Sequence, residues 1–302
     1  MLLNLLLSFA TPFAAPLPAA ETLPLWQAEE TQQEEGTEEG AEELSPKEIA
    51  EAIKEALKGD DASVAVNILK NQGVVADKVV VKAVGGGFSH KDPAVRLEAL
   101  RALRFNEDKY ALSQLLKIGK DKKLMDDPKF AAEYYMALGQ KGDSKAISTI
   151  VKNLVLDNGG NQVTKARLIS LGKIRDKKSV EELMSFMVQG KARRQNPYMK
   201  EISVSLVILT GEMYRARDQW QAWWNDNKRT FKVAKEPAAL PKNEQRKWDM
   251  LWRHPDEIKE RMNQRRGGKD KDGEGEGESE DGKEKRGGKK GRDGAGGVES
   301  DD

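Results

Sequence analysis

Few residues in this sequence could carry out chemistry, and the most concentrated group is a short basic segment. Residues 190–200 read GKARRQNPYMK and contain Lys191, Arg193, Arg194 and Lys200. Two adjacent guanidinium groups can hold a carboxylate or a phosphate through paired hydrogen bonds. These four residues are therefore the candidate binding site, although solvated charges in a loop would give the same pattern.

The residue types that enzymes use do not form a catalytic pattern. Cysteine is absent, which excludes thiolate zinc sites, cysteine nucleophiles and disulfides. The two histidines, His90 and His254, are far apart in sequence. Residues 85–89, GGGFS, lack the Lys-Ser/Thr of a phosphate-binding loop and the glycine spacing around a nucleophilic serine. We therefore expect no catalytic residue, no metal site and no cofactor.

Three tryptophans, Trp220, Trp223 and Trp224, have the spacing that places side chains on one helical face. They could form an aromatic platform for a ligand such as a sugar. Each ring can bury roughly 150–250 Å², so burying all three contributes on the order of 10 kcal/mol. That energy is comparable with the net stability of a whole domain, about 5–15 kcal/mol. We therefore expect these rings to cap the last element of the folded region.

The charged residues are divided unevenly along the 302-residue chain. Residues 1–45 contain nine glutamates and no lysine or arginine, and residues 267–302 contain eight basic and twelve acidic residues. Of the 51 basic and 50 acidic residues, 43 and 29 therefore lie between these ends. The basic middle region favours an anionic partner or the chain's own acidic ends, although an ordinary solvated surface would also explain it.

Both ends differ in composition from the middle. Residues 1–20 include an apolar run of signal-peptide length that is too short to span a membrane, which predicts export. Residues 21–44 are acidic and predict a disordered linker. Residues 267–302 contain twelve glycines and only two apolar residues, which predicts a disordered tail. The folded region must lie between these segments.

The folded region is predicted to begin with a capped helix. Ser45 can cap the free amides, Pro46 suits the first helical position, and Glu48 can complete a capping box. Apolar residues then recur at helical spacing as far as Leu57, and Gly59 ends the helix. Further helices are predicted over about 61–71 and 76–84.

An internal repeat follows these helices. Residues 95–117 match residues 130–152 after a shift of 35, and Asp92-Pro93 matches Asp127-Pro128. A third copy begins 33 residues further on, and a weaker fourth copy covers about 197–227. A period of this length, with two helices in each copy, is typical of an α-solenoid, in which each copy buries the apolar face of its neighbour.

The segment from Asp92 to Arg96, with apolar residues at Ala99, Ala102 and Leu103, resembles the first helix of a HEAT repeat. The resemblance implies an all-α, short right-handed superhelix over residues 45–230, with a ladder of Asp92, Arg96 and Asp127 between neighbouring repeats. Ala131 replaces the second arginine, so the ladder is partial.

Residues 218–225 are similar to a closing segment of exported bacterial HEAT-type proteins, and residues 231–266 predict a basic helical extension. Some HEAT-type enzymes hold two irons with His-Glu pairs, and this sequence has no such pair.

Together these features predict a non-enzymatic, protein-binding scaffold of the cell envelope or exterior, periplasmic or secreted. Its expected partner is a protein or an acidic polymer, and export makes nucleic acid improbable. Two alternatives remain: a lyase-like HEAT-type enzyme, and a purely structural envelope protein.

Overall fold

The computed structural model describes residues 44–154, 160–189 and 196–267. Within these residues all regular structure is helical, which confirms the all-α class. The predicted signal segment, nearly all of the acidic linker and nearly all of the glycine-rich tail lie outside the described residues. No helix in the described ranges is long and apolar enough to cross a membrane.

The α-helices are α1 (Pro46–Lys58), α2 (Ala62–Gln72), α3 (Lys78–Gly85), α4 (Pro93–Phe105), α5 (Tyr110–Ile118), α6 (Lys122–Met125), α7 (Pro128–Lys141), α8 (Ile147–Val151), α9 (Gly160–Lys173), α10 (Lys177–Gln189), α11 (Met199–Thr210), α12 (Arg217–Asn227), α13 (Lys242–Trp252) and α14 (Pro255–Gly267). Two 3-10 turns, η1 (Gly86–Ser89) and η2 (Ser144–Ala146), precede α4 and α8.

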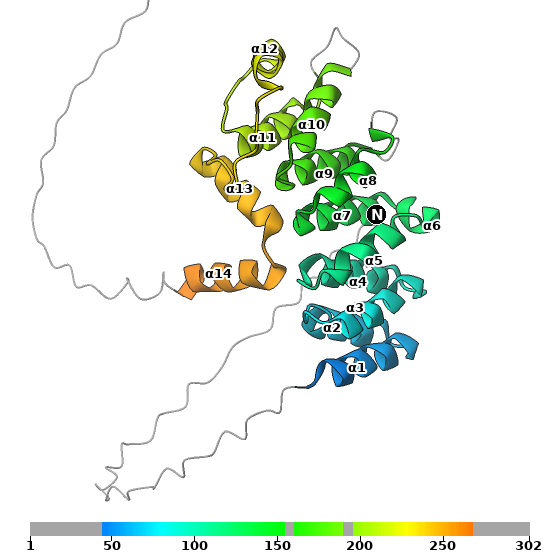
Figure 1. Cartoon of the computed structure of the whole chain (residues 1–302). Helices are drawn as coiled ribbons and strands as arrows, with labels where there is room; N and C mark the ends of the chain where they lie inside the picture. The colour runs from blue at the N-terminus through cyan, green and yellow to red at the C-terminus, as the bar shows by residue number, and fades with distance from the viewer. Residues whose placement is uncertain (1–43, 155–159, 190–195, 268–302) are drawn as a thin grey trace, which may run out of the picture. The chain divides into compact units, whose positions relative to one another are not determined.

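The helices pack in two rows that alternate along the chain (Figure 1). In the first row α2, α4, α7, α9 and α11 lie side by side in that order. The second row contains α1, α3 and α5, followed by α8, α10 and α12. From α1 to α11, the helices of each row contact helices of the opposite row, and the core lies between the two rows.

The helix starts follow the signals in the sequence. The Ser45–Glu48 capping box is present, with the Ser45 amide donating to the Glu48 carboxylate over 2.8 Å. Asp92 and Asp127 accept hydrogen bonds from the amides of α4 and α7, and proline occupies the first turn of both helices. These contacts confirm the predicted starts, because side-chain acceptors satisfy amides that have no partner within the helix.

Small residues let three first-row helices approach closely. A Cβ atom on Gly139 of α7 would lie 2.8 Å from the Ser170 Cα of α9. A Cβ atom on Gly172 of α9 would likewise lie 2.8 Å from the Ser205 Cα of α11. The serine hydroxyls are satisfied across the same contacts, since Ser170 donates to the Tyr135 carbonyl and Ser205 to the Leu168 carbonyl.

Long polar side chains join the C-terminal ends of the first-row helices. Asn106, after α4, donates to the carbonyls of Gly73 and Val75, which follow α2. Lys141, at the end of α7, donates in turn to the Asn106 carbonyl. These bonds satisfy carbonyls that a helix end leaves without partners, so they fix each helix relative to its predecessor.

After α12 the chain returns along the first row; we call residues 228–267 the return segment. Its initial part is held by Arg175, which donates to the carbonyls of Ala234 and Glu236. Further along, Asp256 of α14 forms a 2.9 Å ion pair with Lys70 of α2. Residues 231–266, where a basic helical extension was predicted, contain α13 and α14, and α14 contacts α2 of the first row.

Substituting Gly139 with alanine should lower the unfolding free energy by about 1–3 kcal/mol, because the new methyl group meets backbone that cannot rotate away. Gly85→Ala is the matched control, since its Cβ would only touch the flexible Gln114 side chain at 3.5 Å. That variant should be neutral or gain up to about 1 kcal/mol from helix propensity. Denaturant unfolding followed by circular dichroism measures both, and a Gly139→Ala protein as stable as Gly85→Ala would contradict the close-contact explanation.

Candidate functional site

The centre of the first row contains a buried arginine. Arg104 of α4 is only 7% exposed, and its guanidinium forms a 2.7 Å ion pair with Glu133 of α7. The same guanidinium donates to the carbonyl of Leu251 in α13. A buried cation is tolerated only with such partners, so Arg104 ties α4 to α7 and to the return segment.

Trp252 anchors the return segment beside this arginine. Its ring lies 5.8 Å from the Arg104 guanidinium carbon and 5.3 Å from the Lys173 ammonium of α9, and it packs against Trp248. Cations above an aromatic face are attracted by its negative charge distribution. Burial lowers the pKa of Lys173, while Asp249 opposes this shift. The Trp252 ring is only 7% exposed.

A groove of about 800 Å³ runs between α4, α7 and α9 on one side and α13–α14 on the other. We call it the basic groove. Its lining contains apolar side chains from both sides, namely Leu97, Phe105, Ala132, Met136, Ala166, Ile169, Met250, Leu251, Pro255 and Ile258. Its basic side chains are Arg101, Arg104, Lys129, Lys165 and Arg253.

The charges of the basic groove do not cancel. Glu133 is the only carboxylate in the lining, and Arg104 already neutralises it. Arg101 and Lys165 pair with Glu98 and Glu201, which lie outside the lining, and the two cations themselves remain 42% and 48% exposed. Lys129 forms no ion pair within the described part of the chain. The groove therefore presents net positive charge around an apolar surface.

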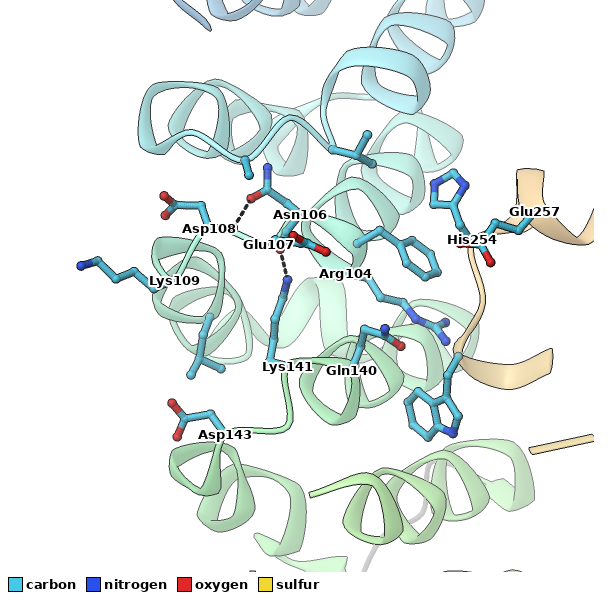
Figure 2. A pocket seen from close by; sticks show the side chains of 15 residues that line it. Arg104, Asn106, Glu107, Asp108, Lys109, Gln140, Lys141, Asp143, His254 and Glu257 are labelled. Atoms are coloured by element: carbon cyan, nitrogen blue, oxygen red, sulfur yellow. Dashed lines mark hydrogen bonds between the residues drawn. The ribbon is translucent and has the colours of Figure 1, made fainter. Parts of the chain in front are cut away.

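A second cleft, of about 770 Å³, lies on the other side of Arg104 (Figure 2). The Lys141 side chain extends into it and donates to the Asn106 carbonyl, whereas Lys109 points away. Burial lowers the pKa of Lys141 to about 8, and the nearby carboxylates Glu107 and Asp108 limit the shift. His254 and Glu257 of the return segment line the opposite wall.

The chemistry available to this cleft is limited. Nowhere in the described ranges do three or more His, Asp or Glu side chains lie close enough to hold a metal ion. The Lys141 amine is directed to a backbone carbonyl rather than to a side chain that could exchange a proton with it. We therefore assign Lys141 a structural role between α4 and α7.

Of the predicted binding residues, Lys191, Arg193 and Arg194 lie outside the described residues. Lys200 is exposed in the first turn of α11. The basic groove is formed by other residues, none of which is among the predicted binding residues. A detectable signal existed in residues 99–105, ALRALRF, where Arg101 and Arg104 interrupt an apolar run at helical spacing.

The three predicted cap tryptophans lie together at α12. Trp220 is fully buried and packs on Tyr214 at a ring distance of 5.0 Å. Trp223 and Trp224 are half-buried and both contact Phe231. Helix α12 packs against α10, which places the aromatic cluster at the last helix of the second row.

The predicted ladder residues make local bonds. Asp92 and Asp127 cap α4 and α7, and Arg96 donates to the carbonyls of His90 and Lys91 at the start of its own helix. Bonds between successive first-row helices come from Asn106 and Lys141. The role of Asp92, Arg96 and Asp127 as a ladder remains a prediction.

Comparison of the sequence with protein-family models gave no match, and a search of curated proteins gave no significant match.

Replacing Trp252 with alanine should release α13 and α14 from the first row, because it removes the buried ring between two cations. A Trp-to-Ala change in a core costs about 3–5 kcal/mol, and here the loss should appear as local opening. Hydrogen exchange of residues 242–263 should therefore accelerate at least tenfold, while exchange in α7 and α9 stays slow. Trp252→Phe keeps an aromatic ring and should change exchange much less. Equal protection in all three proteins would show that Trp252 is not the anchor.

The lowered pKa of Lys141 predicts a pH dependence of stability. Lys141 loses its proton near pH 8 in the folded protein and near pH 10.5 when unfolded, so the unfolded state binds more protons in this window. The unfolding free energy of the wild-type protein should therefore rise between about pH 8 and 10.5 relative to that of Lys141→Gln. Parallel curves for the two proteins in urea titrations would contradict the shift.

Proposed function

We propose that this protein is a non-enzymatic scaffold of the HEAT-repeat type, which holds a segment of another protein in the basic groove. In this proposal residues 45–230 form the right-handed α-solenoid, and the return segment supplies the second wall of its binding groove. Residues 1–20 direct the chain to the cell envelope or exterior.

The observation that carries the proposal is the apolar lining of the basic groove. Met250 and Leu251 are 45% and 39% exposed, and they face a hollow that also contains Met136 and Ile169. Covering apolar surface is favourable by about 25 cal/mol per Å². A groove between helices with apolar anchoring positions is a common way to bind a peptide segment.

The packing of the two rows supports a scaffold. The glycine–serine contacts at Gly139 and Gly172, and the bonds made by Asn106 and Lys141, join consecutive first-row helices. In a solenoid each unit contacts only its neighbours, and together the units present a long surface. The proposed site lies on α4, α7 and α9 of the first row.

Selection of random 16-residue peptides displayed on phage against the full-length protein tests this function. Peptides that the wild-type protein enriches should bind Ile169→Arg at least tenfold more weakly, because the long side chain fills the groove from α9. Val79→Arg is the matched control, since Val79 is 39% exposed on α3 of the second row. It should bind the same peptides as the wild-type protein does.

Two results would overturn the proposal. In one, the selection enriches no peptide at all. In the other, the enriched peptides bind Ile169→Arg as tightly as they bind the wild-type protein. Circular dichroism of each variant establishes that a loss of binding does not come from unfolding.

A further inference from the structure

We infer that the basic groove is the middle of a continuous basic track of three hollows, and that its occupant is an extended acidic polypeptide with interspersed apolar side chains. This inference rests on the function proposed above and adds the chemistry of the partner. It is carried by the residues that the hollows share and by the balance of charge along them.

The first hollow, of about 420 Å³, lies between the N-terminal halves of α4 and α7. It shares Leu97, Arg101 and Lys129 with the basic groove, so a chain can pass between the two without leaving the surface. Arg96 and Lys123 add positive charge, and Lys123 is exposed.

The third hollow, of about 570 Å³, lies in the angle between α13 and α14. It shares Met250, Arg253 and Ile258 with the basic groove, and it adds the exposed Met262. Arg246 and Arg261 lie on its rim. Methionine side chains are flexible and polarizable, which suits a surface that accepts varied apolar side chains.

Basic side chains outnumber acidic ones along the track. With shared residues counted once, ten basic and four acidic side chains line the three hollows. Each of the acids is already engaged: Glu98 pairs with Arg101, Glu133 pairs with Arg104, and Asp249 accepts from Gln245. The fourth, Asp127, caps α7. Of the ten cations only Arg104 is buried, so carboxylates of a partner could reach the exposed ones, namely Lys123, Lys129, Lys165, Lys242, Arg246 and Arg261.

The lining favours a polypeptide over a nucleic acid. The exposed apolar side chains at the α13–α14 end of the track are aliphatic or methionine, namely Met250, Leu251 and Met262. Single-stranded nucleic acids bind through stacking of bases on exposed aromatic rings, and the described lining offers the largely covered rings of Phe105 and Phe130. Neighbouring helices lie about 10 Å apart, so crossing α4, α7 and α9 alone takes roughly 20 Å, the length of about six extended residues.

Fluorescence anisotropy with the full-length protein tests the inference. The probes are a labelled 20-residue peptide of Glu, Leu and Gly, the same peptide with Gln in place of Glu, and a 20-nucleotide oligothymidine. Charge reversals sample the hollows one by one: Lys123→Glu in the first, Lys129→Glu at the shared wall and Arg261→Glu in the third. Lys117→Glu, on exposed α5 surface of the second row, is the matched control.

The Glu peptide should bind the wild-type protein at least tenfold more tightly than the Gln peptide does, with affinity that falls as salt is added. Each of the three reversals should weaken Glu-peptide binding by about tenfold, while Lys117→Glu leaves it unchanged.

Three results would overturn the inference. If Lys129→Glu alone weakens binding, the occupant stays within the basic groove and the track is wrong. If Ile169→Arg removes peptide binding and no reversal affects it, the proposed function stands and the acidic partner does not. If oligothymidine binds as tightly as the Glu peptide, the partner class is wrong.

Discussion

A buried cation holds the middle of the return segment against the first row. Arg104 lies between α4, α7 and α13, and its guanidinium is held by the Glu133 carboxylate, the Leu251 carbonyl and the face of Trp252. A guanidinium cannot lose its proton at ordinary pH, so burying it requires partners of this kind. One of these partners is the Leu251 carbonyl of α13. The hydrogen bond from Arg104 therefore also positions the return segment, which forms one wall of each of the two hollows beside Arg104. The basic groove lies on one side of it and the Lys141 cleft on the other.

Arg104 belongs to the first row, whose helices are joined to one another by several contacts. Helices α7, α9 and α11 approach closely because glycine faces serine at each contact, and the hydroxyls bond across it. At the C-terminal ends, Asn106 and Lys141 donate to carbonyls that the preceding helix ends leave open. Placing Lys141 there has a cost, since burial lowers the pKa of its amine. Close helix contacts and end-to-end bonds thus join consecutive helices of the first row.

The charged side chains of the candidate site fall into two groups. Its carboxylates are paired with arginines or cap helices, and its cations surround apolar side chains. Such a surface gains energy from covering apolar area and from complementary charge, and both contributions are spread over many residues. The proposed scaffold therefore depends on shape and charge complementarity rather than on a single reacting group.

Local structure could be predicted from the sequence. The Ser45 capping box, the Asp92-Pro93 and Asp127-Pro128 starts and the helical spacing of apolar residues predicted the helices, because capping and periodicity are local properties. The tertiary structure alone decided the site. Arg104 and Leu251 are 147 residues apart, and no local pattern indicates that the return segment folds back over α4, α7 and α9. The groove exists only after that contact forms, since its two walls come from distant parts of the chain.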